Sequence, residues 1–266
     1  METLEEKCKA LRATTDYRLP KKTYAMVAID GKNFSRLIKN NYEKPFDDKF
    51  INMMNEVAIY VCKNVQNCKF AYTQSDEITF VLTDFDTEET NAYFDYRLCK
   101  MLSIIPSLAT AKFNQLVTLN LLDVPCSRDD MKQIVADMNL AQFDCKVWDA
   151  ENFNNVFAYL LWRQIDCVRN SKQMAAQTYL SHKELLGKHT DEQVEMLLEK
   201  NGIDWKKYPD DKKYGRFIYK EQIEKPTPNG EICMRNIWKA HNAFPLFDEG
   251  GKEKLISMNV IPIKDK

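Results

Sequence analysis

The sequence predicts an α+β fold, with an antiparallel sheet and its covering helices in the first part and a mainly helical region after it. Two observations lead to this class. Runs rich in β-branched and aromatic residues recur four times before residue 150, and two of the intervals between them carry apolar residues at helical spacing. After residue 150 the helical spacing dominates. We therefore expect one domain over residues 1–150 and a mainly helical region over 151–266 that packs on it or extends it.

The first strand and the first long helix follow from local pattern. Residues 24–29 (YAMVAI) are apolar on both faces, as in a buried strand, and the run ends abruptly at Asp30 and Gly31. Asp47 or Asp48 is placed to cap a helix that runs to about residue 64. Six apolar residues recur at helical spacing in it: Phe50, Met53, Met54, Val57, Ala58 and Val61.

A β-hairpin is expected next. Residues 68–73 and 78–82 are strand-like runs. The residues between them are polar and suit the tip of a hairpin: Gln74, Ser75, Asp76 and Glu77.

The second helix and the last strand of this part complete the order. Residues 87–103 show a helical pattern with Glu88 and Glu89 near its N-terminus, and we expect Pro106 to stop or kink this helix. Residues 143–148 (FDCKVW) form the last predicted strand.

The resulting order β, α, β, β, α, β matches the ferredoxin-like unit. In that topology the first strand lies antiparallel beside the third. Asp30, at the end of the first strand, is therefore expected beside Asp76 and Glu77 at the start of the third strand.

The region after residue 150 carries two helical patterns, at 154–180 and 190–200, and Asn201 with Gly202 ends the second. Residues 203–230 are polar and contain several prolines. We expect irregular loops there, with short strands such as 216–219.

Composition limits the classes of function. The 266 residues include 38 Lys and Arg against 39 Asp and Glu, so the net charge of −1 excludes a globally basic nucleic-acid-binding domain, and any RNA contact must use local patches. The eight cysteines include no CxxC pair, which favours reduced thiols over a zinc site. No signal-like core or membrane-length apolar run is present, so we expect a cytoplasmic protein without a membrane partner.

The three converging acids suggest a metal site. Carboxylate oxygens of Asp30, Asp76 and Glu77 suit Mg²⁺, and two such ions can serve a phosphoryl-type displacement. Asp and Glu are also common in solvated turns, so the residues alone leave both interpretations open.

Five sequence blocks carry a resemblance to a known family. The blocks are DGKNFSR at 30–36, KPFDDKFINMMNEVA at 44–58, AYTQSDEITFV at 71–81, FDCKVW at 143–148 and WRQIDCVRN at 162–170. In this order and spacing they resemble the tRNA-His guanylyltransferase family, over roughly residues 24–219. The resemblance implies that the ferredoxin-like unit is a polymerase-type palm.

The resemblance also implies roles for the acids. Asp30, the backbone carbonyl of Gly31, and Asp76 would hold two Mg²⁺ ions, and Glu77 would be the third catalytic acid.

Further roles concern the nucleotide and the RNA. A nucleoside triphosphate would contact eight residues: Gly31, Lys32, Asn33, Phe34, Ser35, Lys44, Asp47 and Ser75. Backbone N–H groups of 31–35 would face its phosphates, Lys44 would neutralise charge, and Asp47 would contact the activating nucleotide. Arg163 and Asn170 would bind tRNA.

The implied reaction is a 3′-to-5′ nucleotide addition. The 3′-hydroxyl of an incoming nucleotide attacks a tRNA 5′-phosphate that ATP or GTP has activated. Metal charge and alignment supply most of the catalysis in such transfers. The resemblance also implies a homotetramer.

One departure from the family bears on the substrate. Eukaryotic members carry a His-Ile-Asn-Asn run after the WRQ block, whereas this chain has Val168, Arg169, Asn170 and Ser171. The missing histidine is more similar to Thg1-like proteins that repair tRNAs lacking 5′ nucleotides. The alternatives are a tRNA-His guanylyltransferase that adds a single 5′ G, a non-catalytic RNA-binding protein, and a nucleotide cyclase on the same kind of palm.

Overall fold

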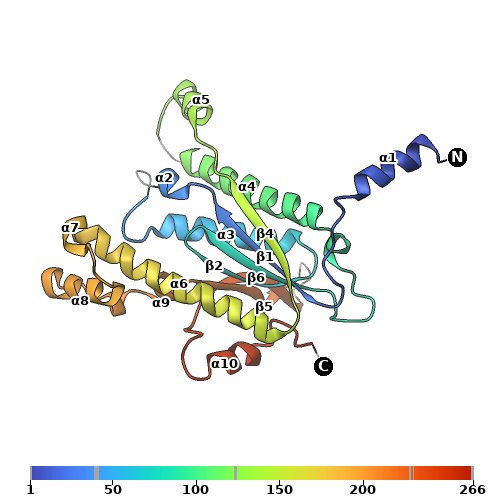
Figure 1. Cartoon of the computed structure of the whole chain (residues 1–266). Helices are drawn as coiled ribbons and strands as arrows, with labels where there is room; N and C mark the ends of the chain where they lie inside the picture. The colour runs from blue at the N-terminus through green and yellow to red at the C-terminus, as the bar shows by residue number, and fades with distance from the viewer. Residues whose placement is uncertain (1, 39–41, 123–124, 228, 230, 265–266) are drawn as a thin grey trace.

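One antiparallel sheet organises the protein (Figure 1). The computed structural model describes residues 2–38, 42–122, 125–227, 229 and 231–264. Within these residues the strand order is β4-β1-β3-β2-β5-β6. The strands are β1 (Tyr24–Gly31), β2 (Cys68–Gln74), β3 (Glu77–Thr83), β4 (Phe143–Ala150), β5 (Arg216–Pro226) and β6 (Ile232–Asn242).

The predicted ferredoxin-like unit is confirmed. Strand β1 is followed by α3 (Asp48–Asn64), the hairpin β2–β3, α4 (Leu98–Leu122) and β4. Within the four strands of this unit, β1 and β3 are the central pair and are antiparallel neighbours, with Ile29 opposite Ile78. Helix α3 begins where its cap was expected, because Asp47 Oδ1 accepts a hydrogen bond from the backbone N–H of Phe50 at 2.8 Å.

Helices cover both faces of the sheet (Figure 1). Alternate residues of β1 explain this, since Ala25, Val27 and Ile29 pack under α3 and α4, whereas Tyr24 and Met26 pack under α6 (Phe153–Tyr179). The unbroken apolar run of the first strand thus reflects burial on two sides. The other helices are α1 (Leu4–Ala13), α2 (Phe34–Ile38), α5 (Arg128–Asp137), α7 (His182–Leu185), α8 (Thr190–Asn201), α9 (Asp210–Tyr214) and α10 (Gly251–Ser257).

The predicted helix over 87–103 was wrong at both ends. Residues 93–96 form a short 3-10 turn in which Phe94 and Asp95 adopt positive φ, and α4 starts only at Leu98. Pro106 does not stop α4, which runs on to Leu122. The missing hydrogen bond at the proline is outweighed by continuous packing, because four fully buried residues follow one face across it: Met101, Ile105, Ala109 and Phe113.

The C-terminal region contributes strands as well as helices. Helices α6 and α8 lie close to the predicted ranges, and Gly202 caps α8 with φ 67°. In place of the expected loops, β5 and β6 form a long hairpin, and β5 pairs with β2. The sheet thus continues past residue 150, and the division of the chain at that point stays a prediction. None of the described helices combines the length and apolar character needed to cross a bilayer.

Gln164 of the WRQ block ties α6 to this C-terminal region. Its side chain is fully buried. Nε2 donates to the backbone carbonyls of Phe244 at 3.0 Å and Tyr214 at 3.3 Å, and Oε1 accepts from the N–H of Leu246 at 2.6 Å. One buried side chain therefore pairs with three backbone groups, of which the N–H of Leu246 is buried and the two carbonyls are partly buried.

Replacing Gln164 by leucine should lower the free energy of unfolding by about 2–4 kcal/mol, because the carbonyl of Phe244 and the N–H of Leu246 lose their side-chain partner. The carbonyl of Tyr214 keeps the hydroxyl of Tyr72 at 2.9 Å. Urea unfolding measures the change. Gln177→Leu, at an exposed position of the same helix, is the matched control and should change stability by less than about 0.5 kcal/mol. Equal stability of both variants would contradict the assigned bonds.

Candidate active site

The acids converge at one end of the sheet. Strand β3 begins at Glu77, and the β1–β3 register places the end of β1, at Asp30, beside it. Ser75 and Asp76 form the tight turn between β2 and β3, where Ser75 adopts φ 47°. Ser75 Oγ donates to Asp76 Oδ1 at 3.0 Å. The prediction that Asp30, at the end of β1, lies beside the start of β3 is therefore confirmed.

Gly31 allows Asp76 to approach the end of β1. A Cβ atom at Gly31 would lie 2.8 Å from Asp76 Oδ2 and 2.4 Å from Cδ2 of Phe34. Such distances are too short for any side chain. The glycine thus leaves room for a carboxylate against the backbone next to Asp30.

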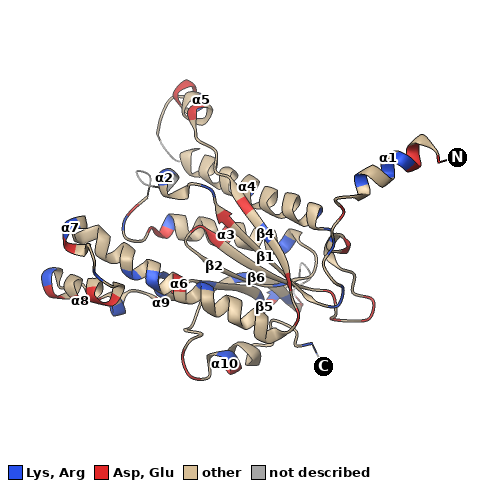
Figure 2. Ribbon diagram, in the orientation of Figure 1, with Lys and Arg blue, Asp and Glu red and all other residues tan. Residues whose placement is uncertain are grey.

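The electrostatics of the site favour a bound cation. Burial, followed by the negative charge of Asp30, raises the pKa of Asp76 to about 6. Burial also raises the pKa of Asp30, with a further contribution from Asp144, which lies directly opposite it on β4. In Figure 2, acidic segments of neighbouring strands lie close together at this end of the sheet. Asp144 belongs to the FDCKVW block, but its sequence pattern alone did not indicate a place at the site.

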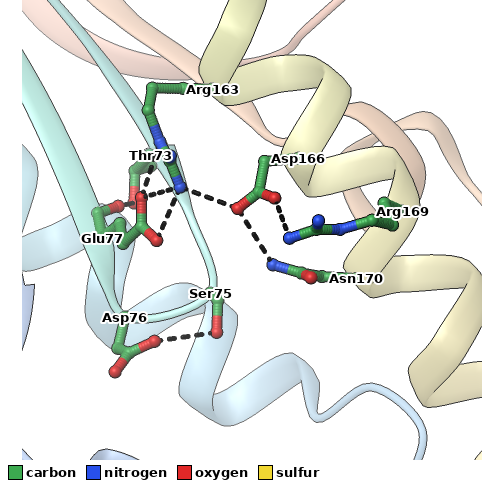
Figure 3. A network of polar contacts seen from close by, with 8 residues as sticks. All are labelled: Thr73, Ser75, Asp76, Glu77, Arg163, Asp166, Arg169 and Asn170. Carbon is green, nitrogen blue, oxygen red and sulfur yellow. Dashed lines mark hydrogen bonds and ion pairs between the residues drawn. The ribbon is translucent and has the colours of Figure 1, made fainter.

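Glu77 differs from the other two acids because it has a positive partner. Arg163 of α6 donates from Nε to Oε2 at 3.0 Å and from Nη2 to Oε1 at 2.9 Å (Figure 3). The Arg163 side chain is 12% exposed and that of Glu77 29%. The sequence predicted neither contact, since the two residues are 86 positions apart.

The network extends along α6. Arg163 Nη2 also contacts Asp166 at 2.8 Å, and Asp166 accepts from Arg169 and, at 3.4 Å, from Asn170 (Figure 3). Arg163 was expected to bind tRNA, but in this structure its guanidinium donates hydrogen bonds to the carboxylates of Glu77 and Asp166. The tRNA roles of Arg163 and Asn170 stay predictions.

A cavity lies next to the acids. It is bounded by the segment before α3, the β2–β3 turn, α6 and α9. Four of the predicted site residues line it, namely Lys44, Asp47, Ser75 and Asn170. Since Ser75 contacts the Asp76 carboxylate, the cavity adjoins the acidic site.

Residues 32–35, which follow β1, differ in their burial and in their contacts. The N–H of Lys32 donates to the carbonyl of Gln142 at 2.9 Å, and its Nζ contacts the same residue at 3.3 Å. Phe34 is buried in the core against Phe113, so its ring cannot face a ligand. Asn33 and Ser35 are exposed, and Asn33 adopts φ 57°. None of these lines the cavity.

The donor set fits Mg²⁺. Asp30, Asp76 and the Gly31 carbonyl offer hard oxygen ligands, and Mg²⁺ commonly binds one or two carboxylates together with substrate phosphates. In the described part of the chain, no group of three or more His, Cys, Asp or Glu residues could hold a metal by itself. The protein would thus supply only part of the coordination shell.

The sequence of this chain matches the sequence model of a known protein family. The sequence model of the Thg1 family, described as tRNAHis guanylyltransferase, matches residues 5–150, which is more than half of the chain. The chain belongs to the tRNA-His guanylyltransferase family. Its members are nucleotidyltransferases, and so is this protein.

Relatives within the tRNA-His guanylyltransferase family cover most of the chain. The uncharacterized protein R259 of Acanthamoeba polyphaga mimivirus is 29% identical over 248 residues, which are 89% of this chain and 83% of that protein. A bacterial tRNA(His) guanylyltransferase (Thg1)-like protein in complex with ATP superposes with a TM-score of 0.79 at 26% identity, covering 97% of this chain and 99% of the other. Such a bacterial protein in complex with GTP gives 0.74 at 26% identity, covering 97% and 98%.

The raised pKa of Asp76 predicts a pH dependence of stability in metal-free buffer. Because its pKa is about 6 in the folded state and its ordinary value is 3.8, the folded protein holds more protons between these values. Stability should therefore fall as pH rises from about 4 to 6, by on the order of 2 kcal/mol. Asp76→Asn should show a clearly smaller fall in urea unfolding with EDTA, and the fall that remains comes from Asp30 and Glu77, whose pKa values burial also raises. Asp149→Asn, at an exposed position of β4, should retain the full fall. Identical profiles for Asp76→Asn and wild type would refute the assignment.

The Arg163–Glu77 pair predicts coupling between two replacements. Arg163→Met and Glu77→Gln should each destabilise, and the double variant should lose at least on the order of 1 kcal/mol less than their sum. Urea unfolding of the four proteins gives the coupling energy. The exposed pair Lys9 and Glu5 is the control and should couple by less than about 0.5 kcal/mol. Additive effects at Arg163 and Glu77 would contradict the pairing.

Proposed function

We propose that the protein is a template-dependent 3′-to-5′ nucleotidyltransferase that adds nucleotides to the 5′ end of truncated tRNA, after activation of that end by ATP or GTP. The observation that carries the proposal is the convergence of Asp30 and Asp76 on Gly31, inside the family's sequence blocks. Unlike Glu77, these two acids form no ion pair among the described residues, so their charge is available to a cation.

We assign Asp30, Asp76 and the Gly31 carbonyl to two Mg²⁺ ions. When bound, the ions neutralise phosphate charge and help to activate the attacking hydroxyl. The chain itself supplies alignment, because the strand ends and the tight turn fix both carboxylates before substrate arrives. Glu77 remains a catalytic candidate whose orientation depends on Arg163.

The nucleotide is proposed to occupy the cavity beside Asp76. Lys44 offers a positive charge there, and Ser75 links the cavity to the acidic site. Asp47 already accepts from the N–H groups of Phe50 and Glu43, which fixes its carboxylate at the cavity wall. The bacterial relatives bound to ATP and GTP support a nucleotide as the occupant.

Val168 supports repair over guanylylation of tRNA-His. Its apolar side chain packs against the small helical core that contains Ala175 and Leu197, so this position offers no polar group to RNA. The chain therefore lacks the histidine that eukaryotic members carry here.

For the complete protein we further propose a homotetramer. Helices α1 and α5, which have no buried residue, are surfaces that such an assembly could cover.

The decisive assay offers Mg²⁺, ATP and all four nucleoside triphosphates to two RNAs, a 5′-truncated tRNA and full-length tRNA-His. Templated extension of the truncated RNA is expected. Asp76→Asn should reduce the rate by at least about a hundredfold, whereas Asp149→Asn should not change it.

Two outcomes would count against the proposal. Addition of a single G to tRNA-His alone would identify the guanylyltransferase activity instead. No extension of either RNA by a protein shown to be folded would leave a non-catalytic role.

A further inference from the structure

Two residues that line the same cavity each carry a buried hydrogen-bond donor without an acceptor in the described part of the chain. Among the described residues, Gln74 Nε2 and Arg216 Nη2 are buried and have no hydrogen-bond partner. The two residues are 3% and 4% exposed, and both line the cavity beside Ser75. A buried donor without an acceptor costs about 1–3 kcal/mol, and more when the group is charged. A ligand that presents acceptors would relieve this cost at both positions.

Arg216 is held in place at the start of β5. Nε donates to Oδ1 of Asn55 at 3.0 Å, and Nη1 reaches the carbonyl of Asp211 at 3.5 Å. These hydrogen-bond partners are neutral, and Arg216 forms no ion pair among the described residues, although the negative charge of Asp211 acts on it from a greater distance. Burial lowers the pKa of Arg216, but a guanidinium stays charged in proteins.

Gly215, the residue before Arg216, fixes the position of the β5 backbone at this point. Gly215 has φ 80°, and a Cβ there would lie 2.7 Å from the carbonyl oxygen of Thr73. Only glycine permits so close an approach of β5 to β2. The backbone therefore sets where the guanidinium lies.

The cavity walls suit a flat, partly apolar group. Phe46, Ile51 and Met174 line it together with the two donors. A purine matches this combination, since its faces are apolar and its polar atoms lie on its edges. Arginine characteristically donates to the O6 and N7 acceptors of guanine. Adenine offers N7 but places an amino group where guanine has O6, and that donor would face another donor.

We propose that Arg216, supported by Gln74, makes this cavity select guanine over adenine nucleotides. The inference rests on the proposed function in taking the cavity as the site of the activating nucleotide. It deepens that function by assigning the activation of the RNA 5′ end preferentially to GTP.

Direct binding to the wild-type protein tests the proposal without RNA. Calorimetry with Mg²⁺ compares GTP, ITP, ATP and the triphosphate of 2,6-diaminopurine riboside. GTP and ITP share O6, whereas the other two carry an amino group at that position. We expect GTP and ITP to bind on the order of tenfold more tightly than the other two. Equal binding of GTP and ATP would overturn the proposal, and so would ITP binding as weakly as ATP.

Variants test the residue assignment. Arg216→Met should lower GTP affinity on the order of tenfold and abolish the preference, and Arg216→Lys should retain only part of it because lysine lacks the planar fork. Lys212→Met is the matched control, since Lys212 lines the same cavity but pairs with Asp48 at 2.8 Å. It should weaken GTP and ATP equally. A GTP preference that survives in a folded Arg216→Met protein would overturn the assignment.

A third variant covers a failure of Arg216→Met to fold. Gln74→Met should reduce the GTP preference while leaving Arg216 in place. An unchanged preference in Gln74→Met would remove Gln74 from the proposal.

The binding and extension assays fail independently. A GTP preference without RNA extension would remove the proposed function and keep this selectivity, and extension without a preference would do the reverse.

Discussion

The antiparallel pairing of β1 with β3 is the constraint on which the rest of the structure depends. It buries an apolar strand between two helical layers, and the same register brings Asp30 beside the turn that carries Asp76. Burying these carboxylates beside other acids is unfavourable: burial is the main cause of the raised pKa of both aspartates, and a neighbouring acid adds to it, Asp144 for Asp30 and Asp30 for Asp76. The surrounding core offsets that cost, because sheet pairing and helix packing leave the strand ends no alternative position.

Helix α6 serves the fold and the site with one continuous surface. Its first turns bury Phe153, Val156 and Leu160 against the sheet. The next turn follows at helical spacing and places Arg163 at Glu77 and Gln164 against the segment that follows β6. The orientation of the catalytic candidate Glu77 is therefore coupled to the packing of the whole helix. A change in α6 packing would reach the acids without any change in their own sequence.

Local pattern predicted what local physics determines. The strands of the ferredoxin-like unit, helix α3 and the meeting of Asp30 with Asp76 follow from apolar periodicity, a cap and a known topology. Helix α4 was misjudged because a rule about proline describes the backbone alone, whereas packing on both sides of Pro106 decided the outcome. The β5–β6 hairpin and the partners of Arg163 depend on contacts between distant segments, which one sequence does not display.

Arg216 shows how a costly residue can indicate function. A buried guanidinium with only neutral hydrogen-bond partners is harder to explain by stability than an apolar side chain of similar size would be. Its position is also specified twice, by the close approach of Gly215 to β2 and by the bond to Asn55 on α3. The fold thus holds an unsatisfied donor at the cavity with some precision. Binding of an acceptor-bearing ligand is the condition under which this arrangement ceases to be unfavourable.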